Sequence, residues 1–240
     1  MNKAKIFLRS TAGNIFFYPA LMIGLSLIVV IGIFSRKKAV YAWDNYIHPV
    51  IFKISLKLYG IEVEIRGKEY IKPMQIYASK HESAMETYAY TAIVKNSAFV
   101  MKKELTYVPI FGWAQAVYGM IPVDRGAGGK AMRGMLNEAK KRVQDGRSIV
   151  IFPEGTRCKH LEVKGYKPGI VFLSEGLNLP IVPVALNTGI HWPKSSYIKY
   201  PGKVVFEFMP PMHLSDYKNK KEFMEELEKR IETTCEKIAF

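Results

Sequence analysis

The chain has 240 residues, 49% of them hydrophobic, and this composition excludes an intrinsically disordered protein. Its 35 Lys+Arg against 21 Asp+Glu give a formal charge of +14, which favours either nucleic acid or an anionic membrane surface as partner. The lysines near the C-terminus are interpreted as solvated surface residues.

The two cysteines, Cys158 and Cys235, lie far apart and in no His/Cys cluster. The sequence therefore predicts neither a zinc site nor a disulfide framework, and a reducing compartment fits.

The N-terminal region predicts a membrane anchor. Residues 15–34 read IFFYPALMIGLSLIVVIGIF, an uncharged run of 20 residues, and a helix of this length is about 30 Å long, the thickness of the hydrocarbon layer. A cleaved signal peptide would have a shorter apolar core and a small-x-small cleavage site. This run ends instead in Arg36, Lys37 and Lys38, so we predict an uncleaved helix. Positive charges flank it on both sides, so charge does not settle its orientation. Pro19, Gly24 and Gly32 would permit a bent, half-inserted segment, so a spanning and a half-inserted helix both remain open.

The next segment predicts a second, amphipathic helix at about residues 40–58. It carries tyrosine and tryptophan, which are typical of the headgroup zone of a membrane. Its apolar residues fall at helical spacing: Val50, Ile51, Ile54 and Leu58. Both an interfacial helix and a core helix of the following domain fit this pattern. We divide the chain into an N-terminal anchor at residues 1–60 and a larger domain at residues 61–240.

After Gly60, strand and helix patterns alternate along the chain. Strand patterns occupy 61–67, 74–79, 97–101, 148–152, 180–186 and 203–209, and helix patterns occupy 84–94, 128–147 with an end at Gly146, 169–178 and 216–240. We therefore predict an α/β fold, with a mixed sheet flanked by helices, preceded by a membrane-anchoring helix or two-helix hairpin. The chain has no Walker loop and no dinucleotide-binding glycine pattern.

Four motifs follow one another in this larger domain. They are SKHESAME (79–86), KKELTYVPIFGW (102–113) with GMIPVDR (119–125), IFPEGTR (151–157) and LPIVPVAL (179–186). With the apolar N-terminal run, they resemble the 1-acyl-glycerol-3-phosphate acyltransferase family, which carries a His-x4-Asp box, a G-x-x-x-x-D-R box, a F-P-E-G-T-R box and a proline-containing apolar box. Each motif alone is a weak signal. The four in this order, from about Tyr77 to Leu186, are a strong one.

His81 and Glu86 are the candidate catalytic pair of the first motif. Acyl transfer to a hydroxyl needs a base that accepts a proton near neutral pH, which histidine can do. A carboxylate on its other ring nitrogen fixes the tautomer and stabilises the imidazolium. We expect His81 at a helix entrance and Glu86 one turn further on. The family pattern has Asp where this chain has Glu86, so the contact between His81 and this carboxylate must accommodate one additional methylene. Glu82 is a rival for the role of the carboxylate. A role for His81 as a cap or surface residue is the alternative.

The reaction that the resemblance implies is direct attack of the acceptor hydroxyl on a thioester. An acyl-serine intermediate on Ser83 is the alternative. The tetrahedral intermediate needs hydrogen-bond donors, and the candidates are the backbone N–H groups of Gly155 and Thr156 or those that follow His81. The resemblance implies no metal and no prosthetic cofactor.

The cations of the second and third motifs are the candidate phosphate ligands. Arginine suits phosphate oxygens, so we expect Arg125 and Arg157 to bind the phosphate of the acceptor, with Lys103 as a third cation. Glu154 is expected to orient Arg157 or the glycerol of the acceptor, or to form a structural ion pair. Lys167 and Gly169, downstream of the third motif, are expected either to contact phosphate or to shape a helix entrance.

The resemblance implies a membrane acyltransferase that moves a fatty acyl chain from acyl-CoA or acyl carrier protein to the sn-2 hydroxyl of lysophosphatidic acid, forming phosphatidic acid. Its partners would be the lipid bilayer, the lysophospholipid and the acyl donor, with the 61–240 domain on the cytoplasmic face of the cytoplasmic membrane. Another lysolipid acceptor, such as lyso-ornithine lipid, or a non-catalytic membrane-anchored lipid-binding protein is the alternative. A nucleic-acid binder is disfavoured, because the chain shows no recognised motif and the apolar run has no place in one.

Overall fold

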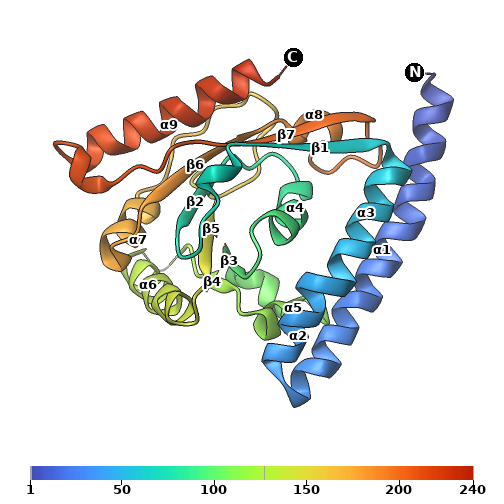
Figure 1. Ribbon diagram of the computed structural model, residues 1–240, viewed down its shortest axis with the longest axis horizontal. Coiled ribbons are helices and arrows are strands. Elements are labelled where there is room, and N and C mark those ends of the chain that lie inside the picture. Colours follow the sequence, from blue (N-terminus) through green and yellow to red (C-terminus); the bar gives the residue numbers. More distant parts are fainter. Residues whose placement is uncertain (1, 127, 240) are drawn as a thin grey trace.

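The computed structural model describes residues 2–126 and 128–239. Met1, the first residue of the predicted anchor, and Phe240, the last residue of the predicted C-terminal helix, lie outside the described residues, as does Ala127. In the described part, seven strands form one sheet (Figure 1): β1 (Ile61–Arg66), β2 (Ile76–Ser79), β3 (Ser97–Lys102), β4 (Ile121–Val123), β5 (Ser148–Ile151), β6 (Ile181–Leu186) and β7 (Gly202–Phe208).

Helices precede the sheet and connect its strands. The α-helices are α1 (Lys3–Phe34), α2 (Arg36–Ala42), α3 (His48–Tyr59), α4 (Met85–Ile93), α5 (Phe111–Tyr118), α6 (Gly128–Gln144), α7 (Gly169–Leu177), α8 (Thr188–His191) and α9 (Lys220–Lys237). A π-helical turn, η1 (Trp43–Ile47), joins α2 to α3, and 3-10 turns lie at η2 (Lys68–Tyr70), η3 (Lys103–Tyr107) and η4 (Leu214–Asp216).

The strand order in the described sheet is β1-β7-β6-β2-β5-β3-β4. Neighbouring strands are parallel except for β6 and β7, so β1 and β7 run against the others. The prediction of an α/β fold with a mixed sheet flanked by helices is confirmed. The sequence patterns missed β4 and the helices α5 and α8, because elements of three to eight residues are too short to show a period.

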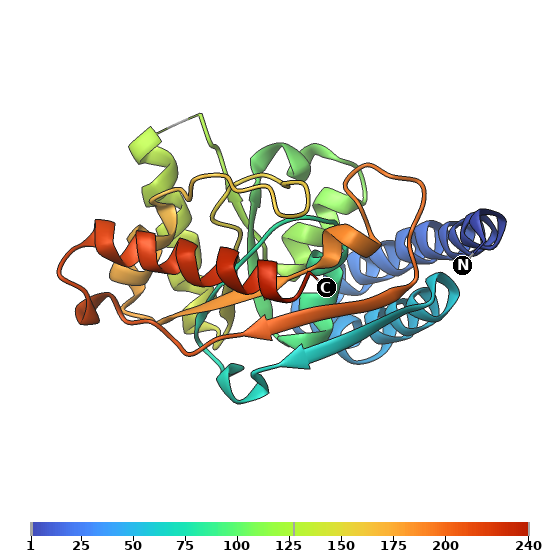
Figure 2. The same cartoon turned by 90° about the horizontal axis from the view of Figure 1, so that it is seen from above.

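The sheet is covered on both faces, which explains why its central strands are apolar throughout. Every residue of β2, β5 and β6 is buried. One face, with Tyr77 and Val150, packs against α1, α3, α4 and α5, and the other, with Ile76 and Ile149, packs against α6, α7 and α9. Figure 2 shows this layering from above. Because β2 and β5 are parallel neighbours, the polar segments that follow them begin at the same edge of the sheet.

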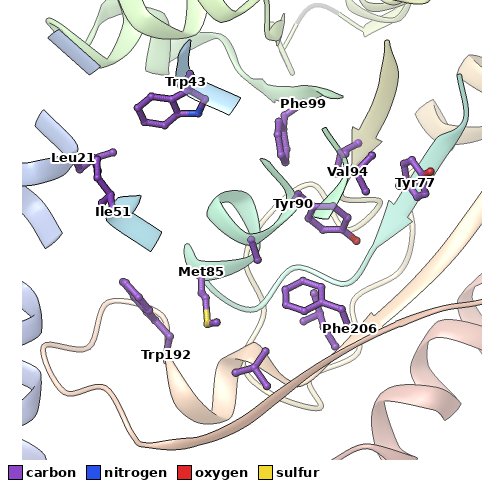
Figure 3. Close-up of a cluster of buried hydrophobic side chains, with 14 of the residues drawn as sticks. Leu21, Trp43, Ile51, Tyr77, Met85, Tyr90, Val94, Phe99, Trp192 and Phe206 are labelled. Atoms are coloured by element: carbon purple, nitrogen blue, oxygen red, sulfur yellow. The ribbon is translucent and has the colours of Figure 1, made fainter. Parts of the chain in front are cut away.

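The helix α1 begins at Lys3, well before the apolar run, and lies beside α3 in a two-helix hairpin (Figure 1). By length and composition, α1 could cross a membrane. One face of it is nevertheless buried in the core of the α/β unit, where Leu21 joins Trp43, Ile51 and Trp192 (Figure 3). The opposite face is exposed and apolar: Ile15, Ile23, Val30, Ile33 and Phe34.

Polar contacts fix the N-terminal half of α1 to the loop between α8 and β7. Ser10 Oγ donates to the carbonyl oxygen of Lys199 at 3.1 Å, and Asn14 Nδ2 donates to that of Tyr197 at 3.1 Å. Tyr59 of α3 donates its hydroxyl to Asn14 Oδ1 at 2.9 Å. These groups are buried or half-buried, so moving α1 away would leave them without partners. The hairpin and the α/β unit therefore share one core.

A buried lysine joins the end of β2 to α9. Lys80 is fully buried, and its Nζ donates to both carboxylate oxygens of Glu232 at 2.7 Å and to the carbonyl oxygen of Glu162 at 2.8 Å. The Tyr166 hydroxyl donates to Glu232 Oε1 at 3.0 Å, and Lys80 Nζ lies 3.8 Å from Glu154 Oε1. Burial raises the pKa of Glu154 to about 7, against the opposing effects of its hydrogen bonds and of Lys80.

The close contact of α1 with α3 gives a first prediction. A Cβ on Gly13 would lie 2.2 Å from Cε1 of the Tyr59 ring, whereas a Cβ on Gly134 of α6 would meet nothing within 4 Å. We expect Gly13→Ala to lower the free energy of unfolding by about 1–3 kcal/mol. Gly134→Ala is the matched control and should raise it by about 0.5–1 kcal/mol. Thermal unfolding of both variants in detergent measures the difference, and equal stability would contradict the packing described.

The buried Glu154 gives a second prediction. Its pKa of about 7 lies above the ordinary 4.5, so the folded protein binds more protons than the unfolded chain between these values. The free energy of unfolding should therefore fall as the pH rises from about 5 to about 8. Glu154→Gln removes this titration and should make the decline shallower by about 1 kcal/mol per pH unit. Glu236→Gln, at an exposed position of α9, should follow the wild type when unfolding is measured at each pH.

Candidate active site

His81 and Glu86 meet at the edge of the sheet where β2 ends. His81 lies in the loop between β2 and α4, and Glu86 is the second residue of α4. His81 Nδ1 lies 2.7 Å from Glu86 Oε1. The Glu86 side chain is fully buried, whereas 17% of the His81 side chain is exposed. The histidine ring is therefore the accessible member of the pair.

The buried Glu86 carboxylate accepts hydrogen bonds from four donors. Oε1 accepts from His81 Nδ1 and from the backbone N–H groups of Glu82 at 2.8 Å and Ser83 at 2.7 Å. Oε2 accepts from Thr188 Oγ1 of α8 at 2.8 Å. A carboxylate accepts hydrogen bonds through both oxygens, and both Glu86 oxygens have a partner here. With the ring proton on Nδ1, facing Glu86, Nε2 is the ring nitrogen left free of this contact.

The ring and the backbone of His81 are both held by the segment after β5. The His81 ring stacks on Phe152, with centroids 3.9 Å apart and an interplanar angle of 15°. The His81 N–H donates to Glu154 Oε1 at 3.1 Å, and the His81 carbonyl oxygen accepts from the Cys158 N–H at 2.7 Å. Phe152, a member of the third motif, and Thr188, outside all four motifs, were not predicted as site residues.

The two alternative side chains that the sequence left open, Glu82 and Ser83, make contacts with groups other than His81. The Glu82 carboxylate lies 3.0 Å from Nδ1 of His160 and accepts from the Gly189 N–H at 2.8 Å, so its contacts are not with His81. Ser83 is buried, and its Oγ accepts from the N–H of Met85, the first residue of α4, at 3.0 Å.

Two cavities meet at His81. One, of about 330 Å³, is mostly apolar and extends beneath α1, α4 and α5, where Leu21, Trp43 and Phe99 line it (Figure 3). The other, of about 610 Å³, extends toward α6 and the segment after β5. Both are lined by His81 and Arg157 and by a shared set of neighbours: Thr87, Phe99, Met101 and Leu105.

Cationic side chains line the larger cavity. Arg125, Arg157 and Lys167 contribute to its wall, and Arg125 donates to the carbonyl oxygen of Gly155. Lys103 is placed differently: its Nζ pairs with Asp124 Oδ2 at 3.4 Å on the exposed surface. As far as the described residues go, Lys103 lines neither cavity.

Some of the backbone N–H groups considered as oxyanion donors already donate to other acceptors. Gly155 has φ +69°, in the left-handed region that favours glycine, and its N–H donates to the Phe152 carbonyl oxygen at 2.9 Å. The N–H groups after His81 are taken up by Glu86. Within residues 2–126 and 128–239, the Thr156 N–H donates to no protein acceptor. Glu154 faces inward to Lys80 and the His81 backbone, and no ion pair joins it to Arg157 in the described structure.

Comparison with known proteins places this site in a family. A family model described as Acyltransferase matches residues 62–187. The 1-acyl-sn-glycerol-3-phosphate acyltransferase of Pseudomonas aeruginosa is 37% identical over 156 residues, which cover 64% of this chain and 60% of that protein. The enzyme of the same name from Limnanthes alba is 30% identical over 176 residues, covering 72% and 62%. The matches thus span less than two thirds of these relatives' own lengths.

The fold also has a counterpart among solved structures. The crystal structure of the 1-acyl-sn-glycerophosphate acyltransferase PlsC from Thermotoga maritima superposes with a TM-score of 0.78 at 22% identity, covering 96% of each chain. At this identity, the likeness shows a shared fold. The family model takes in more than half of the 240 residues, including the His81–Glu86 pair and the 151–157 segment. The chain therefore belongs to the acyltransferase family, as its four motifs predicted.

Proposed function

We propose that this protein transfers a fatty acyl chain from a thioester donor to the sn-2 hydroxyl of lysophosphatidic acid, forming phosphatidic acid. The observation that carries the proposal is the position of His81, whose ring lies where the apolar cavity meets the cation-lined cavity. We assign the acyl chain to the first cavity, because its lining is mostly apolar, and the phosphate to the second, because cations line it. The names of the two relatives described above support this choice of acceptor.

The proposed reaction uses His81 as general base. The acceptor hydroxyl gives its proton to His81 Nε2 while its oxygen bonds to the thioester carbonyl carbon. The carbon–sulfur bond then breaks, and the departing thiolate takes the proton back from the imidazolium. Glu86 holds Nδ1–H and stabilises the imidazolium between these steps. The Thr156 N–H is our candidate donor to the oxyanion, because it has no acceptor in the described structure.

The cations of the larger cavity are proposed to bind the acceptor phosphate. Arg157 is central, since it lines both cavities and lies beside the same neighbours as His81. Arg125, Lys167 and Lys102 share its cavity. Because Lys102 is paired with Glu104 at 3.1 Å, Lys167 replaces Lys103 as the third cation of the proposal. The donor is proposed to be acyl-CoA or acyl carrier protein, and the reaction requires no metal or prosthetic group.

The protein is proposed to attach to one membrane leaflet through the α1–α3 hairpin. A spanning α1 would have to give up its buried face and the hydrogen bonds of Ser10 and Asn14. Lying in the interface instead, the hairpin keeps these contacts and buries its exposed apolar face in lipid. The apolar cavity then opens beside the layer that holds the acyl chains, with the catalytic unit on the cytoplasmic side.

A variant of His81 tests the general base. His81→Ala should lower kcat by at least about 10²–10⁴-fold while the unfolding temperature stays near that of the wild type. His213→Ala, an exposed histidine outside both cavities, is the control and should keep full activity. The assay follows phosphatidic acid formed from acyl-CoA and lysophosphatidic acid in detergent. A near-normal rate in His81→Ala would exclude the proposed base.

Thr188 should act as a positioning residue through Glu86. Thr188→Val leaves the buried Glu86 Oε2 without a donor, which costs about 1–3 kcal/mol. We expect kcat to fall by roughly tenfold with little change in KM, and Thr188→Ser to restore most of it, because serine retains the hydroxyl. Equal rates in the valine and serine variants would show that this hydrogen bond does not support catalysis.

Arg157 tests the phosphate assignment. Arg157→Ala should lower kcat/KM for lysophosphatidic acid by roughly 10–100-fold, because a charge-assisted hydrogen bond is lost. Arg133→Ala, on the exposed face of α6, should leave it unchanged. The same assay with lyso-ornithine lipid, which has no phosphate, should show little effect of either variant. If the wild type turned over lyso-ornithine lipid faster than lysophosphatidic acid, the acceptor would be reassigned to the aminolipid and the role of His81 would stand.

A further inference from the structure

A third hollow, of about 760 Å³, lies at the opposite end of the sheet from His81. Asn96 directly precedes β3 and Arg147 directly precedes β5, so the hollow borders the amino ends of these parallel strands, whereas His81 follows the carboxyl end of β2. Its other walls are α2, η1 and the end of α6. No residue that lines it also lines the two cavities at His81, within the described chain. The proposed reaction makes no use of this hollow.

Four cations line the hollow: Arg36, Lys37, Lys95 and Arg147. No carboxylate of the described residues forms an ion pair with any of them. The two carboxylates in the lining have other partners: Asp44 accepts from the Tyr118 hydroxyl at 2.6 Å, and Asp145 pairs with Arg142 at 3.6 Å. The hollow therefore holds four cations against two carboxylates, an excess of positive charge with no ion pair to any of the four in the described structure.

The buried guanidinium of Arg147 makes the positive charge of the hollow energetically unfavourable. It is 4% exposed, it donates to the carbonyl oxygens of Tyr118 and Ser97, and its Nε has no acceptor in the described structure. Desolvation lowers the pKa of Arg147, as do the neighbouring charges of Arg142 and Arg36, whereas Tyr118 and Asp44 act in the opposite direction. An unpaired buried charge is unfavourable, and a bound anion would offset it. The volume also falls within the range of about 300–1,000 Å³ that is usual for small-ligand sites.

The apolar surroundings of the hollow indicate where the anion comes from. Val40 and Tyr41 belong to its lining, and Tyr41 is 60% exposed with its ring edge-on to Tyr46. The segment follows directly on the end of α1, where Ile33 and Phe34 are 75% and 85% exposed. Aromatic and basic side chains in this combination are typical of the headgroup level of a membrane.

We propose that this hollow binds the phosphate headgroup of an anionic membrane lipid, as a second anion site separate from the catalytic cavities. The assignment to a membrane lipid rests on the proposed attachment of the hairpin to one leaflet. Arg36 and Arg147 are anchored by backbone carbonyls and form the fixed wall, because Arg36 Nε donates to the Val117 carbonyl oxygen at 2.9 Å. Lys37 and Lys95 are exposed and supply the outer contacts.

The test compares two double variants of equal charge. Lys37→Gln/Lys95→Gln removes the two outer cations of the hollow, and Lys229→Gln/Lys237→Gln removes two exposed lysines of α9 that also form no ion pair in the described structure. Titration calorimetry in detergent measures binding of dioctanoyl phosphatidylglycerol, dioctanoyl phosphatidylcholine and inorganic phosphate. Unfolding temperatures without lipid should match the wild type in both variants, which shows that the fold is intact.

We expect saturable binding of phosphatidylglycerol to the wild type and the α9 variant, weakened by roughly tenfold or more in the variant of the hollow. Phosphatidylcholine and inorganic phosphate should bind far more weakly. If inorganic phosphate binds as tightly as phosphatidylglycerol and the same variant loses it, the anion site stands and its assignment to a membrane lipid is overturned. Equal binding of phosphatidylglycerol by both variants would overturn the site. Neither result bears on acyl transfer, because Lys37 and Lys95 lie outside the proposed catalytic machinery.

Discussion

The candidate site depends on the complete hydrogen bonding of one buried carboxylate. Glu86 has no contact with solvent, so each of its lone pairs must find a donor inside the protein or its charge would be strongly disfavoured. The donors come from the β2–α4 loop and from Thr188, about a hundred residues further along the chain. The positions of α4 and α8 therefore hold Glu86, and through it they fix the tautomer and the orientation of His81.

The parallel arrangement of β2 and β5 sets the remaining geometry. It brings the loop with His81 beside the segment with Phe152, so that the imidazole ring lies between a fixed carboxylate and an aromatic face. Different elements cover the two sides of this edge of the sheet. On one side, α1 and α5 leave an apolar cavity, and on the other, the turn after β5 and α6 leave a cation-lined one. The proposed assignment of acyl chain and phosphate rests on this division.

Buried charge occurs at both ends of the same sheet, with different degrees of compensation. At the carboxyl end, Lys80 is paired with Glu232, and the nearby Glu154 has a raised pKa that makes its stability contribution depend on pH. At the amino end, Arg147 has carbonyl partners and no ion pair in the described structure. The first arrangement pairs its lysine within the chain and supports the loop of His81, although the buried Glu154 Oε2 has no hydrogen-bond partner in the described structure. The second leaves Arg147 without an ion pair in the described structure and with its Nε unpartnered, which is the physical basis for the proposed lipid site.

The sequence by itself determined the fold class and the family and predicted the His81–Glu86 pair with Glu82 as a rival, because strand and helix periods and the spacing of four motifs are local properties of the chain. Only the tertiary structure decided which groups share a site. It placed Lys167 rather than Lys103 in the cation-lined cavity, turned Glu82 toward His160 and Glu154 inward, and added Phe152 and Thr188. Side-chain direction at a sheet edge depends on which strands become neighbours, and no local pattern encodes that choice.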